Sequence, residues 1–507
     1  MRSPTKVAAI VVIGALTVTA CSSSGDSGEP PDSITIVQGS GPANLNPLQD
    51  ETRAVQSVFS TMFETLTVID SDRELQPLLA TDWEQTDDTT WRFNLRDDVE
   101  FHNGEPFNAE AVTFTIERMQ DPAQKSTKLA RLGGIDTAEV VDEYTVDITT
   151  TSPMPLLPNE MSQLYIVPPQ YTTENPETSS TEAVGTGPYE LSSYEPGQKV
   201  VVTVFDGYWG AQPEVKTINW EVIADESARI ASLQSGTSDL INGFSPDQVP
   251  TLEAGGLNVK AGKSGLGMVL TMNTLSGPFE DVRVRQAAAL AVDIPAIVQE
   301  LLGGYAEPLD NQLQGPETFG YNEALAPVQR DVEAAADLLA DAGHANGVDI
   351  TFEAPSGRYT NDRQVAEAIA AQLEEAGFNV STTVQEYQPF LESVKTKETD
   401  MYFIGWYSTP LFDASNSLTW FTSDNVFSYW QDSAYDDALA TAASSSDPAV
   451  RQAAFDEATS IMAEESPAVF LYDSQTLFAA GDKLADWEPR GDDLIWYRDL
   501  TTGSASL

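Results

Sequence analysis

Aromatic side chains are concentrated in residues 401–430, where they could line a pocket. Ten of these thirty residues are aromatic, against 9% of the whole chain. They are Tyr402, Phe403, Trp406, Tyr407, Phe412, Trp420, Phe421, Phe427, Tyr429 and Trp430. The segment has no lysine or arginine, and its acidic residues are Asp413 and Asp424. Aromatic walls bury apolar ligand surface and a lone carboxylate anchors a cation, so this composition favours a small-molecule site.

The same segment contains a strand, which sets where a site could lie. Tyr402, Phe403 and Ile404 are interpreted as part of its core. Trp406, Tyr407 and Asp413 follow at or past its end, where open α/β sheets bind ligands. For these three residues a pocket role and a purely structural role both stay open.

The sequence lacks two catalytic motifs that are common in secreted bacterial enzymes. The sequence has no G-x-S-x-G elbow and no H-E-x-x-H pair, and its histidines are His102 and His344. Gly262-Lys263-Ser264 lacks the first glycine of a phosphate-binding loop, because residue 257 is leucine. We therefore predict no catalytic residue, no metal site and no cofactor. With 78 acidic residues a glycosidase pair stays open, so a secreted hydrolase is the enzyme alternative.

The first 32 residues are predicted to direct export and anchoring. Arg2 and Lys6 precede an apolar run over 7–20, too short for a normal spanning helix, so 1–20 is predicted to be a signal peptide. The run ends at Val-Thr-Ala-Cys21, which resembles the bacterial lipoprotein signal, and residues 22–32 form a Ser/Gly/Pro-rich tether. We expect lipidation of Cys21. The alternative is an ordinary signal peptide with Cys21 as a free thiol.

Periodicity in the rest of the chain predicts an α/β fold. Residues 33–37 alternate like a strand, and apolar spacing from Val55 to Leu66 predicts an amphipathic helix. Residues 66–183 are predicted to be strand-rich. From about residue 274 helices and strands alternate, with Asp293 and Asp447 as N-caps. Such alternation indicates βαβ units and a parallel sheet.

Chain length and net charge limit the number of lobes and the class of ligand. At 507 residues the chain exceeds the size of one hydrophobic core, so we expect two or more lobes. The 26 basic and 78 acidic residues give a formal net charge of -52. That field repels phosphate backbones and anionic headgroups, which argues against nucleic-acid binding.

Several segments resemble, in order, the family-5 extracellular solute-binding proteins, the dipeptide, oligopeptide and nickel-binding group of ABC importers. The resemblance extends over nearly all of the chain after the tether. It is carried by 44–47 (NLNP), 75–80 (LQPLLA), 91–96 (WRFNLR), 101–107 (FHNGEPF), 185–189 (GTGPY), 208–209 (YW) and 278–287 (PFEDVRVRQA). In this context His102 is interpreted as a structural loop residue.

The resemblance implies a two-lobed periplasmic-binding-protein-like fold with a hinge between the lobes and a ligand enclosed by them. Lobe one would comprise 33–272 and 479–507, with 66–183 as an extra subdomain, and lobe two 274–478. The hinge would be crossed near Asn273 and at 473–476. The protein would be a monomer, held by a lipid anchor on the outer side of the cell membrane, that delivers a small peptide to ABC permease and ATPase subunits.

The resemblance also extends the predicted site. Residues 357–362 (GRYTND) resemble a family loop in which an arginine can meet the ligand carboxylate, and a solvated surface role for Arg358 is the alternative. The predicted ligand-binding residues are Arg358, Tyr359, Trp406, Tyr407, Asp413 and Asn416.

One departure from the family pattern bears on the ligand. Peptide-binding relatives commonly carry an aspartate shortly after the Gly-Trp pair, where it binds the peptide ammonium. Here the nearest acid after Gly405-Trp406 is Asp413, three or four positions late. A glycoside, a neutral amide or a chelated metal therefore stay open as ligands, as does a sensor that does not import.

Overall fold

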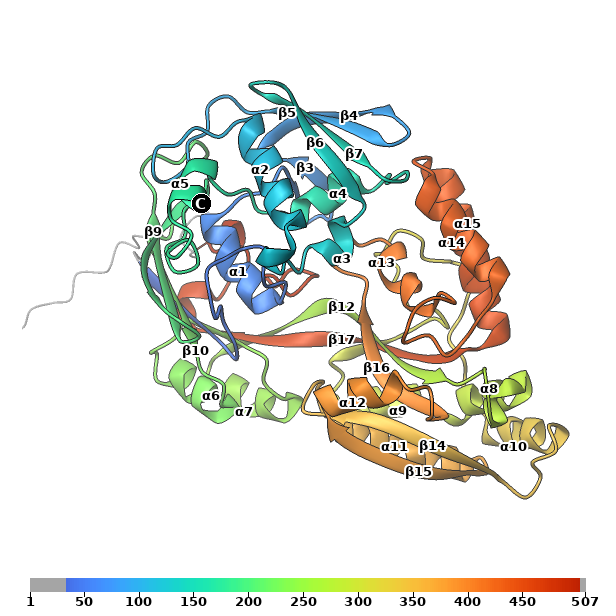
Figure 1. Ribbon diagram of the computed structural model, residues 1–507. Helices are drawn as coiled ribbons and strands as arrows, with labels where there is room; N and C mark the ends of the chain where they lie inside the picture. Colours follow the sequence, from blue (N-terminus) through green and yellow to red (C-terminus); the bar gives the residue numbers. More distant parts are fainter. Residues whose placement is uncertain (1–32, 502–507) are drawn as a thin grey trace, which may run out of the picture.

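The computed structural model describes residues 33–501, so the predicted signal peptide, Cys21 and the tether lie outside the described residues. Within that range no helix combines the length and apolar character that a membrane span requires. Strands and helices alternate along the described chain and form one large sheet, two smaller sheets and surrounding helices (Figure 1). The α/β class predicted from the sequence is confirmed.

The large sheet has eleven strands and runs through the whole molecule. In spatial order they are β15 (Phe378–Glu386), β14 (Val348–Ser356), β16 (Met401–Tyr407), β12 (Asn258–Met272), β17 (Ala468–Ala480), β11 (Leu240–Asn242), β1 (Ser33–Gln38), β10 (Thr217–Val222), β9 (Lys199–Val204) and β8 (Tyr189–Glu195), with β13 (Ala306–Pro308) paired to β17.

Strands β12 and β17 are the longest of the sheet, and they join its two halves (Figure 1). At one end β17 pairs with β11, and its Phe478 and Ala480 pack into the core around β1. At the other end β12 pairs with β16 from Leu266 onward, within a different core. The two long strands therefore connect two separately packed lobes.

The register between β12 and β17 shifts midway along the pair. Lys263 lies opposite Gln475, but the next pairing is Leu266 with Ser474. The extra residues include Gly265, whose φ of 63° lies in the left-handed region that glycine favours. A bulge of this kind bends and twists a strand locally. It marks where the pair passes from one lobe to the other.

Asn273, predicted to lie at the hinge, is elsewhere. It follows the far end of β12, is 3% exposed, and its side-chain amide donates to the carbonyl oxygens of Lys397 and Thr399. Its surroundings belong to lobe two, because β12 already pairs with β16 from Leu266. The other predicted crossing, 473–476, contains the register shift.

Lobe two is built on a βαβ unit. Strand β14 pairs in parallel with β15, and α11 (Asp362–Glu375) connects them. The predicted helical face of Val365, Ile369 and Leu373 is buried, and the helix ends before Gly377, whose φ is 106°. The predicted N-caps are also confirmed: the Asp293 carboxylate accepts from Ala296 N at 3.0 Å and that of Asp447 from Ala449 N at 2.8 Å.

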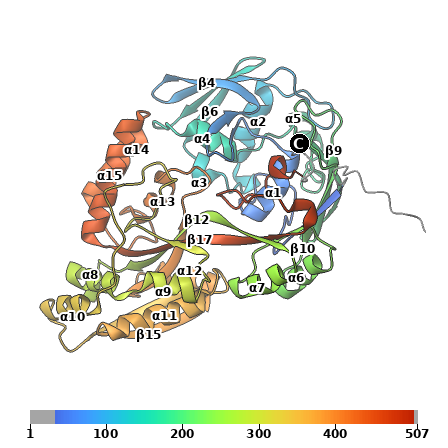
Figure 2. The same cartoon turned by 180° about the vertical axis from the view of Figure 1, so that it is seen from behind.

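The extra subdomain of lobe one has its own sheet and core (Figure 2). Its strands lie in the order β4 (Ala80–Asp87), β5 (Thr90–Leu95), β7 (Thr145–Thr150) and β6 (Ile135–Asp142), and β2 (Thr67–Ile69) pairs with β3 (Leu75–Pro77) nearby. The region is strand-rich as predicted. It also contains α2 (Ala109–Gln120), α3 (Leu129–Leu132), α4 (Leu157–Glu160) and α5 (Pro169–Glu174).

The remaining helices cover the faces of the large sheet and the outer side of lobe two (Figures 1 and 2). They are α1 (Arg53–Met62), α6 (Glu226–Gln234), α7 (Val249–Ala254), α8 (Val282–Ala291), α9 (Ile294–Glu300), α10 (Val332–Asp341), α12 (Tyr387–Val394), α13 (Ser415–Leu418), α14 (Ser433–Ser444) and α15 (Pro448–Glu465).

Helix α1 is shorter than its apolar pattern predicts. It ends at Met62 because Phe63 is extended, with φ of -120°. The Gly-Thr-Gly segment packs directly on this end, and Gly187 N donates to Met62 O at 3.0 Å. A Cβ on Gly185 would lie 2.1 Å from Met62 O. The glycines of this motif therefore allow close backbone approach.

Candidate functional site

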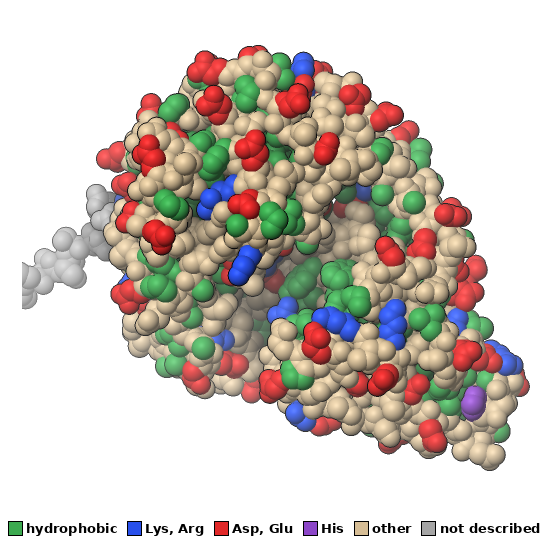
Figure 3. Space-filling view, in the orientation of Figure 1, with side chains coloured by type: hydrophobic (Ala, Val, Ile, Leu, Met, Phe, Trp, Pro, Cys, Tyr) green, Lys and Arg blue, Asp and Glu red, His purple; other side chains and the backbone are tan. Residues whose placement is uncertain are grey.

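A hollow of about 450 Å³ lies between the lobes, next to the register shift in β12 and β17. It is lined by 243–246 and Asp493 from lobe one, by 474–477 of β17, and by 357–361 and Tyr407 from lobe two. Its volume is in the range of small-molecule sites, ~300–1,000 Å³. The surface is deeply recessed between the lobes, with hydrophobic and basic side chains near the lower rim (Figure 3).

The loop that carries Arg358 is held in shape by one carboxylate. Asp362, 4% exposed, accepts hydrogen bonds from the backbone N–H groups of Gly357 at 3.2 Å and Arg358 at 2.8 Å, and also from that of Tyr359. Three donors on one carboxylate fix the loop at the C-terminal end of β14. Arg358 is thus presented to the hollow on a rigid turn.

The guanidinium of Arg358 is surrounded by tyrosines. Its central carbon lies 5.1 Å from the ring centroid of Tyr387 and 5.5 Å from that of Tyr359, within cation–π range. It forms no ion pair with any acidic side chain of residues 33–501. Partial burial alone would lower the pKa of Arg358, but the neighbouring tyrosines raise it. The hollow therefore contains a positive charge that no carboxylate of residues 33–501 neutralises.

Trp406 and Tyr407 have different surroundings although they are neighbours on β16. Consecutive strand residues point to opposite faces of the sheet. Tyr407 faces the hollow, and burial raises its pKa. Trp406 is 8% exposed and stacks on Trp420, with ring centroids 4.1 Å apart. The structure thus brings Arg358, Tyr359 and Tyr407 together and places Trp406 in the packing of lobe two.

Asp413 is held by Arg451 in a buried ion pair. Two 2.9 Å hydrogen bonds join the guanidinium to both carboxylate oxygens. The Asp413 side chain is 5% exposed and that of Arg451 8%. Ser415 donates two further bonds to the same carboxylate. Arg451 also donates to Ala442 O, which ties the loop after β16 to α14 and α15. Asp413 does not line the hollow that contains Arg358.

Asn416 stabilises the loop after β16 and also contacts lobe one. Its amide donates to the carbonyl oxygens of Tyr407 at 3.0 Å and Thr409 at 2.7 Å. Its side-chain oxygen accepts a 2.7 Å hydrogen bond from Arg131 on α3, in the extra subdomain. This residue therefore supports the hollow's wall and joins the lobes, without lining the hollow itself.

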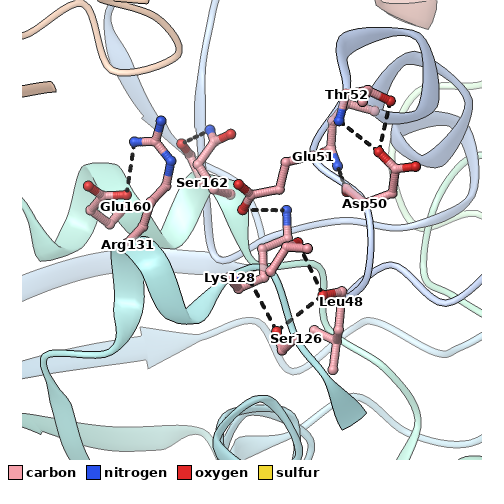
Figure 4. A network of polar contacts seen from close by, with 12 residues as sticks. Leu48, Asp50, Glu51, Thr52, Ser126, Lys128, Arg131, Glu160 and Ser162 are labelled. Carbon is pink, nitrogen blue, oxygen red and sulfur yellow. Dashed lines mark hydrogen bonds and ion pairs between the residues drawn. The ribbon is translucent and has the colours of Figure 1, made fainter. Parts of the chain in front are cut away.

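Arg131 belongs to a polar network at the edge of the subdomain (Figure 4). Its Nη1 lies 3.8 Å from Glu160 Oε2, and burial raises the pKa of Glu160 to about 7. Beside them the Lys128 side chain is 1% exposed and its Nζ lies 3.3 Å from Glu51 Oε1. The network fixes α3, so that Arg131 can reach lobe two.

An apolar contact also crosses between the lobes. Leu411 and Phe412, in the loop after β16, pack with Ile69 of β2. Phe412 has φ of 52°, unusual for a bulky residue, and the Arg73 guanidinium lies 5.1 Å from its ring. The loop after β16 is therefore a docking element between lobes as well as a wall of the cleft.

Sequence reasoning missed two residues of this region. Tyr387 begins α12 and contacts the Arg358 guanidinium without lining the hollow, and no local pattern marks it. Asp493 comes from the C-terminal segment of lobe one and reaches the hollow only through the fold. His102, interpreted as structural, lies outside the hollow; its Nδ1 accepts from Gly185 N, and burial lowers its pKa to about 4.

Comparison with known proteins gives the family context of this arrangement. Residues 74–429 match the family model described as bacterial extracellular solute-binding proteins, family 5 Middle. The glutathione-binding protein GsiB of Pectobacterium atrosepticum is 27% identical over 483 residues, covering 92% of this chain and 93% of that protein.

Solved structures show the same fold. DppA of Helicobacter pylori, in complex with the peptide STSA, superposes with a TM-score of 0.77 at 23% identity, covering 93% of this chain and 98% of that one. NikA of Brucella suis, in complex with Fe(III)-EDTA, superposes with a TM-score of 0.82 at 25% identity, covering 93% of this chain and 99% of that one.

Because Asp413 is buried with Arg451, we expect Arg451→Met to destabilise the protein strongly. An uncompensated buried charge costs about 3–5 kcal/mol of unfolding free energy. Arg92→Met is the matched control, since its 2.7 Å pair with Asp147 is more exposed and such pairs contribute about 0–1 kcal/mol. Urea unfolding measures both losses. Adding Asp413→Asn to Arg451→Met should recover part of the loss; equal, small losses for the two single variants would contradict a buried pair.

Proposed function

This chain belongs to the bacterial extracellular solute-binding proteins of family 5, and from that premise we propose that its solute is a small peptide or peptide-like molecule with a free carboxylate. It is the solute-binding component of an ABC importer, and its family consists of binding proteins rather than enzymes. The observation that carries the proposal is Arg358, a fixed cation in the interlobe hollow without an acidic partner in residues 33–501.

Arg358 suits a carboxylate in both geometry and charge. A guanidinium presents parallel N–H donors that match the two oxygens of a carboxylate. The chain as a whole carries a net charge of -52 and repels anions at long range. An anionic group therefore needs a local cation to enter the hollow. Tyr359, which lines the hollow beside Arg358, supplies ring surface for the apolar part of such a solute.

The relatives support a peptide-like solute. GsiB is named for glutathione, which is itself a tripeptide, and the DppA structure contains the peptide STSA. A hollow of about 450 Å³ is compatible with a solute of this size class. NikA, another solved relative, holds Fe(III)-EDTA, a polycarboxylate chelate, so an anionic chelate is the second candidate. Arg358 would meet a carboxylate in either case.

The importer partners and the membrane anchor are part of the same proposal. The family implies a permease and an ATPase that receive the solute. Cys21 ends a lipoprotein-like signal, and two or more acyl chains give stable anchoring at about 0.8 kcal/mol per buried CH2. The tether 22–32 would then leave the binding lobes free above the outer face of the membrane.

We expect Arg358→Gln to weaken binding of trialanine or glutathione by more than tenfold, because a lost charge partner costs about 2–5 kcal/mol. Isothermal titration against the wild type measures the loss. Arg363→Gln, an exposed arginine outside the hollow, is the matched control and should bind like the wild type. The C-terminal amide of trialanine should bind the wild type and Arg358→Gln equally. Equal losses for acid and amide would contradict a carboxylate contact.

For the anchor, Cys21→Ala should remove membrane attachment, because the acyl chains and not the acidic body provide affinity for lipid. Detergent phase partitioning of the processed proteins makes the comparison. The wild type is expected in the detergent phase and the variant in the aqueous phase. A processed Cys21→Ala protein that still partitions into detergent would refute the lipid anchor.

A further inference from the structure

Asp493 is an acidic residue of the hollow with one carboxylate oxygen, Oδ1, that the described residues leave unsatisfied. It lies in the C-terminal segment of lobe one, with φ of 63°, and lines the hollow together with Arg358 and Tyr407. Its Oδ1 is shielded from solvent and accepts no hydrogen bond from any described residue. A buried, unpaired carboxylate oxygen is costly unless a partner completes it.

The neighbouring residue shows how the same segment satisfies a structural carboxylate. Asp492 pairs with Arg490 through contacts of 3.1 and 3.3 Å and accepts from Leu494 N at 3.2 Å. Asp492 therefore fixes the segment. Asp493, one position on, also lines the hollow, but no residue of 33–501 donates a hydrogen bond to its Oδ1.

Five groups face Asp493 from the elements packed around it. They are Arg53 of α1, Asp492 of the same segment, Asp473 and Thr476 of β17, and Tyr407 of β16. Burial raises the pKa of Asp493 to about 7, and Asp492 adds to this effect. Thr476 and Arg53 oppose it, but Arg53 forms no ion pair with Asp493 in the described chain. The surroundings do not supply the cation that the ionised carboxylate would need.

We propose that Asp493 binds a cationic group of the solute, the ammonium of a peptide, while Arg358 binds the carboxylate at its other end. The inference rests on the proposed function, since it requires a carboxylate-bearing solute in this hollow. In this arrangement lobe one binds the ammonium of the solute and lobe two binds its carboxylate, so one zwitterionic solute contacts both lobes. The sequence favoured Asp413 for the ammonium contact. We assign this contact to Asp493 instead, because the Asp413 carboxylate already accepts two hydrogen bonds from Arg451.

Glu226 provides a matched control on the same wall. It also lines the hollow, but its Oε1 accepts from Ser245 N at 3.2 Å and from Ser245 Oγ at 2.7 Å. Glu226→Gln removes one negative charge from the hollow without removing an unpaired oxygen. It therefore separates a direct contact from a general electrostatic effect.

The test is isothermal titration of wild type, Asp493→Asn and Glu226→Gln with trialanine and N-acetyltrialanine at pH 7.5. We expect Asp493→Asn to weaken trialanine by more than tenfold. N-acetyltrialanine, which has no ammonium, should bind all three proteins alike. That ligand also shows that the variant is folded. Glu226→Gln should bind trialanine within a factor of about three of the wild type, as for a charge without a direct contact.

Each other outcome overturns the inference. Equal losses for both ligands, no loss for either, or an equal loss in Glu226→Gln would remove Asp493 from the cation role while leaving the proposed function intact. A wild type that binds neither trialanine, N-acetyltrialanine nor glutathione would refute the peptide proposal itself, and the inference with it. The wild type alone therefore distinguishes the two failures.

The pH dependence gives a second readout without a variant. Below pH 7 the Asp493 carboxyl takes up a proton and loses its charge, whereas a peptide ammonium, with a pKa of about 7.7–8.0, stays charged. Trialanine should therefore bind the wild type more weakly at pH 5.5 than at pH 7.5, by up to about tenfold per unit below pH 7. N-acetyltrialanine corrects for other titrating groups. An equal pH response of the two ligands would contradict the assignment.

Discussion

The pairing of β12 with β17 is the constraint on which the rest of the structure depends. The two strands pair from Asn258–Ala480 to Thr271–Ala468 and pass from one hydrophobic core to another along their length. The register shift near Gly265 interrupts the pairing between the lobes, and we propose that the lobes bend relative to each other at this point. The solute hollow lies directly beside this point.

The charged groups around the cleft divide into those that the fold satisfies and those that it leaves unpaired. Asp413 with Arg451 and Asp362 with its three backbone donors shape the walls, and both carboxylates are fully engaged. Among residues 33–501, Arg358 forms no ion pair and Oδ1 of Asp493 accepts no hydrogen bond. Departures from local satisfaction are expected at functional sites, where a ligand supplies the missing partner. This contrast, more than the number of aromatic residues, is the basis on which we propose Arg358 and Asp493 as the binding groups.

Local patterns predicted the elements well, because caps and periodicity act over a few residues. The N-caps at Asp293 and Asp447 and the buried face of α11 are examples. The site was harder to predict, because its geometry is set by residues distant in sequence. Strand alternation places Trp406 and Tyr407 on opposite faces of the sheet. Arg451, 38 positions further along the chain, forms the ion pair with Asp413. Asp493 approaches Tyr407 only once β12 and β17 have joined the lobes, so its local sequence contains no signal of a site.

The account requires a solute that joins two lobes able to move about β12 and β17. Small-angle X-ray scattering of the protein with and without saturating trialanine measures this directly, with binding verified by titration under the same conditions. The account predicts a smaller radius of gyration when the ligand is bound, since Arg358 and Asp493 lie on opposite lobes. A radius that stays unchanged while trialanine is bound would show that the solute does not draw the lobes together, and would contradict the account.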